Sequence, residues 1–169
     1  MIEQLTSTLI NLIMDVFGNI FGIFLLAMTP ILELRGAIPV GVGLSDYEWW
    51  QIYIAAVLGN LVPVPFAVFF LRKIVSWFKK RGPLKKFANK VEEKTAAKAD
   101  KIKNGIKIGL FLFVAIPLPG TGAWTGSLIA SMLDMRLKDC IFPISLGVVV
   151  AGIIVTVISY GVKFSFGIF

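Results

Sequence analysis

The sequence predicts an all-α integral membrane protein, built as an inverted repeat of two re-entrant helical hairpins plus spanning helices, with amphipathic helices at the surface. Hydrophobic residues make up 57% of the 169 residues and charged residues 16%, whereas soluble domains carry about 25% charged residues. Four stretches are almost free of charge, at residues 17–32, 51–71, 108–133 and 140–162. Pro and Gly interrupt the hydrophobic sequence near residues 30–39 and 117–122, and broken backbone at membrane depth needs protein or a cavity around it.

Residues 1–16 carry apolar side chains at helical spacing, which predicts a helix in the membrane interface or at the rim of the bundle. The same segment could instead continue through residue 28 as one long span, and the sequence leaves both readings open. A removable signal peptide is not expected, because Glu3 stands where a basic region would be needed.

The first hairpin is expected between residues 18 and 44, with its tip at residues 33–39. Glu33 and Arg35 lie here in otherwise apolar sequence, and such charges are expensive in hydrocarbon unless they face protein or a watery cavity. Gly36 and Pro39 should interrupt a helix. Each arm has about 12 residues, or ~18 Å, which reaches only the middle of a ~30 Å hydrocarbon core.

The next stretches predict a loop and the first full span. Residues 45–50 are acidic and aromatic, which suits the headgroup level outside the cell. Residues 51–71 should cross the membrane, with a kink and freed carbonyls at Pro63 and Pro65.

The basic segment 72–107 fixes the orientation. It holds 13 of the 17 Lys and Arg residues and three acidic residues, and such segments stay in the cytoplasm. Residues 84–104 should form a charged helix in solvent or on the membrane surface. We therefore expect a multi-pass protein of the cell membrane that does not bind nucleic acid.

The second hairpin is expected at residues 108–133, with its tip at 117–122 and both ends in the cytoplasm. Gly109 and Gly126 are among the small residues that should allow close helix packing. Residues 140–162 form the last span, ending outside near Lys163.

The two halves of the chain resemble each other in kind. Gly36 and Ala37 correspond to Gly122 and Ala123, and Leu58-Gly59 corresponds to Leu146-Gly147. We expect one membrane domain, 1–169, divided into a first repeat (1–78), a cytoplasmic basic helix (79–104) and a second repeat (105–169). In inverted-repeat transporters, broken helices meet near the midplane.

Three motifs carry a family resemblance: Glu-Leu-Arg-Gly-Ala-Ile-Pro at 33–39, Leu-Gly-Asn at 58–60 and Pro-Leu-Pro-Gly-Thr-Gly-Ala-Trp-Thr-Gly at 117–126. They resemble the prokaryotic small multidrug export proteins, a family distantly similar to the DedA and VTT membrane proteins. The resemblance implies paired re-entrant hairpins, dimerisation, and transport or scrambling of lipids. The second tip lacks the charges found in the wider superfamily.

The predicted function is a secondary transporter or lipid flippase, with a midplane site for an anionic lipid phosphate or a small amphipathic molecule. Glu33 would take up a proton or bind a cation while Arg35 and helix N-termini hold an anionic headgroup; alternatively the two charges only hold the tip closed. The candidate substrate- or ion-binding residues are Glu33, Arg35, Gly36, Pro39, Asn60, Pro117, Pro119, Gly120, Thr121, Gly122, Trp124 and Thr125.

Other functions stay open. The alternatives are a non-transporting protein that assembles in or shapes the bilayer, an exporter of lipophilic cations, and a passive pore. No enzyme, metal or cofactor is expected, because the chain has no His and no phosphate-binding loop. The expected partners are membrane lipids and a second copy of the chain, with Gly152 a candidate residue of the dimer interface.

Overall fold

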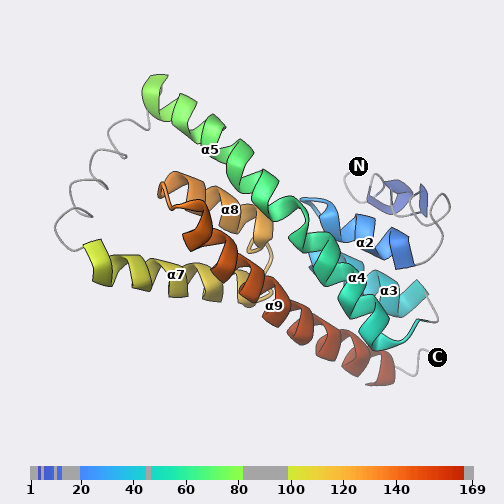
Figure 1. The fold of residues 1–169 in the computed structure, drawn as a ribbon. Coiled ribbons are helices and arrows are strands. Elements are labelled where there is room, and N and C mark those ends of the chain that lie inside the picture. The colour runs from blue at the N-terminus through green and yellow to red at the C-terminus, as the bar shows by residue number, and fades with distance from the viewer. Residues whose placement is uncertain are drawn as a thin grey trace. The chain divides into compact units, whose positions relative to one another are not determined.

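The computed structural model describes residues 4, 6–9, 11–12, 20–44, 47–81 and 99–165. Within these ranges the regular structure is helical and contains no strand, so the all-α prediction is confirmed there. The main helices (Figure 1) are α2 (Ile20–Met28), α3 (Glu33–Leu44), α4 (Trp49–Leu61), α5 (Pro63–Arg81), α7 (Ala99–Ala115), α8 (Ala123–Met132) and α9 (Leu137–Ser165).

Two helical segments of the described chain are long and apolar enough to cross a membrane. They are Trp49–Trp77 and Leu137–Ser165, each of 29 residues. At 1.5 Å per residue each is about 43 Å long, which exceeds a ~30 Å hydrocarbon core. The predicted spans at 51–71 and 140–162 lie inside these segments.

The chain forms two compact units. One contains residues 1–63 and 148–169, and the other contains residues 64–147. The first unit thus holds α2, α3, α4 and the last part of α9, and the second holds α5, α7, α8 and the first part of α9. The expected division into repeats 1–78 and 105–169 stays a prediction.

In the first unit α2, α3 and α4 pack side by side (Figure 1). Gly41 lies against α2 and α4, since a Cβ atom there would be 2.8 Å from Ile23 and 2.9 Å from Ile52. Gly59 lets α4 approach even closer, because its Cβ would be 2.2 Å from the carbonyl oxygen of Phe24. These small residues set the helix spacing in this unit.

The last part of α9 completes this unit. A Cβ at Gly152 would be 2.9 Å from both the Tyr53 ring and Val57. The Tyr53 hydroxyl also donates a hydrogen bond to the carbonyl of Val149, at 3.2 Å. This packing assigns Gly152 to contacts within one chain rather than to a subunit interface. The homodimer itself stays a prediction.

In the second unit α8 packs on α7. A Cβ at Gly126 would be 2.7 Å from Val114, and one at Gly147 of α9 would be 3.0 Å from the carbonyl oxygen of Phe111. Gly109, by contrast, is exposed and has open space around it. The expectation that Gly109 packs closely against a neighbouring helix is therefore wrong in this unit.

The first hairpin turns earlier than the sequence predicts. The turn comprises residues 29–32, where the Thr29 hydroxyl donates to the Leu26 carbonyl at 2.7 Å. Gly36 and Pro39 lie inside α3 instead of forming the tip. A proline in a helix removes one hydrogen bond, and here the buried side chains of Ala37 and Ile38 hold the helix against its neighbours.

Two other predicted breaks are found. Residues 116–122 separate α7 from α8, as the Pro- and Gly-rich tip predicts. The first span is divided at Val62, directly before Pro63. The junction between residues 1–16 and α2 lies outside the described residues, as does most of the predicted basic helix at 84–104. Re-entrant hairpins and an inverted repeat stay predictions.

Candidate functional site

An ion pair lies at the start of α3, next to the turn of the first hairpin. Arg35 Nη1 donates to Glu33 Oε2 at 2.8 Å. The Glu33 side chain is 7% exposed and that of Arg35 is 18% exposed. Both charged groups are therefore largely shielded from solvent and lipid. Their burial is offset by the ion pair and by nearby polar groups.

The backbone at Glu33 makes this pair possible. Residues two apart point to different sides of a regular helix, but Glu33 has φ of 50°, in the left-handed region. Residues other than Gly, Asn and Asp rarely adopt this backbone conformation. Such a conformation costs about 1–3 kcal/mol and is concentrated at binding and switch sites. The left-handed backbone at Glu33, the first residue of α3, is therefore what brings the two side chains together.

Asn60, on the last turn of α4, is the second polar group of this region. It is 1% exposed, and its Oδ1 atom has no hydrogen-bond partner among the residues that the structure describes. Gly41 and Ile52 mark where α3 and α4 touch. Consecutive helices joined by a short connection run antiparallel. Glu33 is eight residues before Gly41 on α3, and Asn60 is eight residues after Ile52 on α4. Both therefore lie ~12 Å from this contact, in the same direction along the helix axes. Asn60 thus lies at the level of the ion pair.

Thr156 of α9 is a buried polar residue that sequence reasoning missed. It is 8% exposed, and within the described part of the chain its Oγ1 atom has no hydrogen-bond partner. Pro39 of α3 and Ser159 of α9 line one hollow, and Thr156 is three residues before Ser159, on the side toward the hairpin turn. The signal in the sequence was a single threonine within an apolar span.

The seven candidates of the second hairpin lie between α7 and the first turn of α8. The Thr121 hydroxyl is within hydrogen-bonding distance of the carbonyls of Ile116 (2.8 Å) and Leu118 (2.9 Å), and it accepts from the Leu118 amide at 3.2 Å. Gly120 has φ of 79°. Thr121 therefore organises the turn. This group also contains Pro117, Pro119, Gly122, Trp124 and Thr125.

The N-terminus of α8 has no side-chain cap. Gly122 occupies the N-cap position and provides no side-chain oxygen. Trp124 and Thr125 follow in the first turn and are half-buried, whereas Pro119 and Gly120 are exposed. The first amides of a helix carry partial positive charge, so this end has the polarity expected for an anion-binding half-helix.

The structure thus groups the predicted residues in two sets. Glu33, Arg35, Gly36 and Pro39 follow one another on α3, and Asn60 lies at their level on α4. The other seven belong to the second unit. That the two tips meet at the midplane stays a prediction. Among the described residues, no three His, Cys, Asp or Glu side chains form a group that could hold a metal ion.

Comparison with known proteins gives one family. A family model described as "Putative small multi-drug export protein" matches residues 33–154. The match begins at Glu33 and includes α3 and α8, the helices that follow the two turns. No curated protein matches the chain, and no solved structure matches it.

Proposed function

The chain belongs to the small multidrug export protein family, and from this premise we propose that it is a secondary transporter of the cell membrane. Its family and the two long apolar helices of the described chain support a membrane location, and the family name supports export. The observation that carries the finer proposal is the largely buried Glu33–Arg35 pair, with Glu33 in a left-handed backbone conformation. Buried charges in a membrane protein mark substrate or ion pathways.

Proton uptake by Glu33 is the proposed switch. While Glu33 is ionised, its carboxylate neutralises Arg35 at 2.8 Å. Protonation removes that charge and leaves the guanidinium in a poorly solvated place, where a new anion is strongly favoured. Arg35 can then bind a phosphate or carboxylate through two parallel hydrogen bonds. Asn60, with its unpartnered Oδ1 at this level, would accept a hydrogen bond from the substrate or from the protonated carboxyl.

The pair favours an anionic amphiphile, such as a lipid phosphate, over a lipophilic cation. A cation would have to displace Arg35 from Glu33, to which it is hydrogen-bonded. An anion needs only the loss of the Glu33 charge. Export of lipophilic cations is the second candidate, which the family name supports. It predicts that substrate competes with Arg35 and that binding weakens as Glu33 is protonated.

A similar contact in each unit supports a repeated hairpin architecture. Gly59 faces the carbonyl of Phe24, and Gly147 faces the carbonyl of Phe111. In both units, therefore, a glycine of a long helix packs against the first arm of the preceding hairpin. The offsets are 88 residues for the glycines (59 to 147) and 87 for the phenylalanines (24 to 111). Together with the basic segment 72–107, these contacts lead us to propose opposed hairpins in an inverted repeat.

Transport by the reconstituted protein tests the proposal. Liposomes containing the purified chain should move a fluorescent lipid phosphate, at a rate that depends on the pH gradient. Glu33→Gln should abolish that dependence, whereas Glu48→Gln, a matched change at an exposed carboxylate, should leave it intact. Unchanged pH dependence in Glu33→Gln would remove this residue from the mechanism.

A charge-swapped variant separates transport from structure. Glu33→Arg combined with Arg35→Glu retains two opposite charges but moves each to the other position. If the pair serves only to hold the turn, flux per folded molecule should match that of the wild type in this variant and in Glu33→Gln. A protein without flux in any form would instead support a role in membrane assembly.

The proposed orientation has its own test. Single cysteines replace Ser45, Lys90 or Asp134 in a Cys140→Ser background, and intact cells are treated with an impermeant thiol reagent. Labelling at Ser45 alone is expected, because basic segments stay in the cytoplasm. Labelling at Asp134 but not at Ser45 would invert the topology. Mass measurement in mild detergent and nanodiscs tests the proposed homodimer, which a monodisperse monomer in both would refute.

A further inference from the structure

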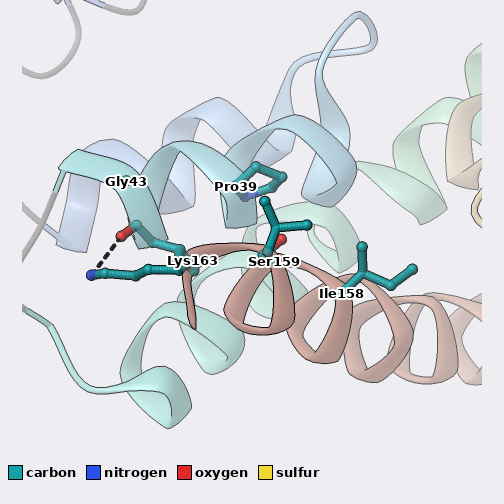
Figure 2. Close-up of a pocket in the computed structure, with 7 residues that line it drawn as sticks. Pro39, Gly43, Ile158, Ser159 and Lys163 are labelled. Atoms are coloured by element: carbon teal, nitrogen blue, oxygen red, sulfur yellow. Dashed lines mark hydrogen bonds between the residues drawn. The ribbon is translucent and has the colours of Figure 1, made fainter. Parts of the chain in front are cut away.

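A groove runs between the C-terminal halves of α3 and α9 (Figure 2). Its volume is about 310 Å³. Its residues are apolar apart from one hydroxyl and one ammonium group, and comprise Pro39, Val42, Gly43, Ile158, Ser159, Val162 and Lys163. Ile158 and Val162 are about half exposed, at 55% and 47%, so the groove opens to the outside of the chain.

The hollow is built into the sequence at Gly43. A Cβ atom at this position would meet no atom of the described residues within 4 Å. The glycine therefore leaves space that a larger residue would occupy, and the rigid Pro39 ring lines the groove one turn earlier on α3. Because a spanning segment is surrounded by lipid, an open apolar groove along it is filled by hydrocarbon chains.

Lys163 lies at one end of the groove and gives it a charge. Its Nζ atom donates a hydrogen bond to the Val42 carbonyl at 3.1 Å, as the dashed line in Figure 2 shows. An ammonium group has three N–H donors, so two remain for an anionic ligand. Lys163 is two residues from the end of the 29-residue α9, and lysines at such positions direct the ammonium group toward the headgroups.

We propose that this groove binds a phospholipid with an anionic headgroup. Part of one acyl chain lies against Pro39, Gly43 and Ile158, and the lipid phosphate accepts hydrogen bonds from Lys163. The volume is at the lower end of the ~300–1,000 Å³ range of ligand pockets, so it holds a chain segment rather than a whole molecule. The α3 part of the groove begins at Pro39, four residues after Arg35, and Pro39 is also a candidate residue of the ion-pair site. Lipid binding in the groove nevertheless requires neither transport nor protonation of Glu33.

Native mass spectrometry of the full chain in mild detergent measures this binding directly. The probes are phosphatidylglycerol and phosphatidylcholine with identical acyl chains. The wild type should bind the anionic lipid about fivefold more tightly, the contribution of one lysine near an anionic surface. Lys163→Gln should bring the ratio close to one, because it removes the positive charge that favours a headgroup with net negative charge, and Lys163→Arg should preserve the ratio.

The apolar half of the site is tested by filling it. Gly43→Leu should weaken binding of both lipids, because its side chain enters the space of the acyl chain. Gly161→Leu is the matched control, since a Cβ at Gly161 also meets nothing within 4 Å and the residue is outside the groove lining. Circular dichroism confirms that each variant is folded, and the lysine variants keep the test decisive if a leucine variant is not.

Several results would overturn the proposal. These are equal affinity of the wild type for the two lipids, unchanged anionic preference in Lys163→Gln, and equal loss of binding in Gly43→Leu and Gly161→Leu. Displacement of the bound lipid by millimolar inorganic phosphate would show an anion site without a role for the groove.

Discussion

Replacing Gly59 by alanine should destabilise the first unit by about 2 kcal/mol. The new Cβ would lie 2.2 Å from the Phe24 carbonyl oxygen, whereas Cβ atoms in proteins essentially never lie within 3.0 Å of a non-bonded heavy atom. The helices must therefore separate by at least 0.8 Å, the difference between 3.0 and 2.2 Å. Overpacking of this kind costs ~1–3 kcal/mol, here at the upper end because a backbone atom cannot rotate away. Alanine's better helix propensity returns up to ~1 kcal/mol.

Thermal and denaturant unfolding in one detergent, followed by circular dichroism, measures the effect. Two matched substitutions provide a scale. Gly147→Ala places its Cβ 2.8 Å from Val114 and 3.0 Å from the Phe111 carbonyl oxygen, so its cost should be smaller. Gly109→Ala meets nothing within 4 Å and should be neutral or slightly stabilising.

The order of the three variants is decisive. If Gly59→Ala were as stable as Gly109→Ala, the close approach of α4 to α2 would be wrong. If all three variants lost equal stability, the effect would belong to glycine in general and not to these contacts.

Three further predictions concern polar contacts, each measured by unfolding in detergent. Arg35→Gln should cost ~3–5 kcal/mol by leaving the buried Glu33 carboxylate unpaired, and the double change with Glu33→Gln should cost less; a larger loss in the double variant would contradict this. Thr121→Val should cost ~1–2 kcal/mol and speed hydrogen exchange in residues 116–122, because it removes the hydroxyl that holds the turn. Lys107→Gln should cost below ~1 kcal/mol of unfolding free energy, because both side chains of its 2.7 Å pair with Asp139 are more than a third exposed. High salt screens this pair, so the difference from the wild type should shrink there.

The second hairpin turn was predictable because its signal is local. Two prolines and two glycines within six residues leave no helical alternative between α7 and α8. At the first turn the same reasoning placed the tip too late. Gly36 and Pro39 are isolated breakers, and packing of their neighbours kept the helix intact, whereas Thr29 and Pro30 formed the turn.

The candidate site was predictable where it depends on composition. Charges at 33 and 35 are conspicuous in apolar sequence, but the left-handed backbone at Glu33 that brings them together has no sequence signal. Thr156 and the α3–α9 groove could not be foreseen in this way. They depend on which faces of two distant helices meet, and hydrophobic periodicity does not reveal the partner of a helix that is apolar on all sides.

The order of synthesis gives the last part of α9 a particular importance. Its hydrogen bonds to the first unit join residues 96, 113 and 121 positions apart, from Val149, Tyr160 and Lys163 to Tyr53, Tyr47 and Val42. Residues 64–147, by contrast, form one continuous stretch. The ribosome therefore finishes the second unit before the first can close, and α2–α4 must wait in the membrane with one face uncovered. A chain that stops near residue 147 should retain a folded second unit and become a substrate for membrane proteases through its first.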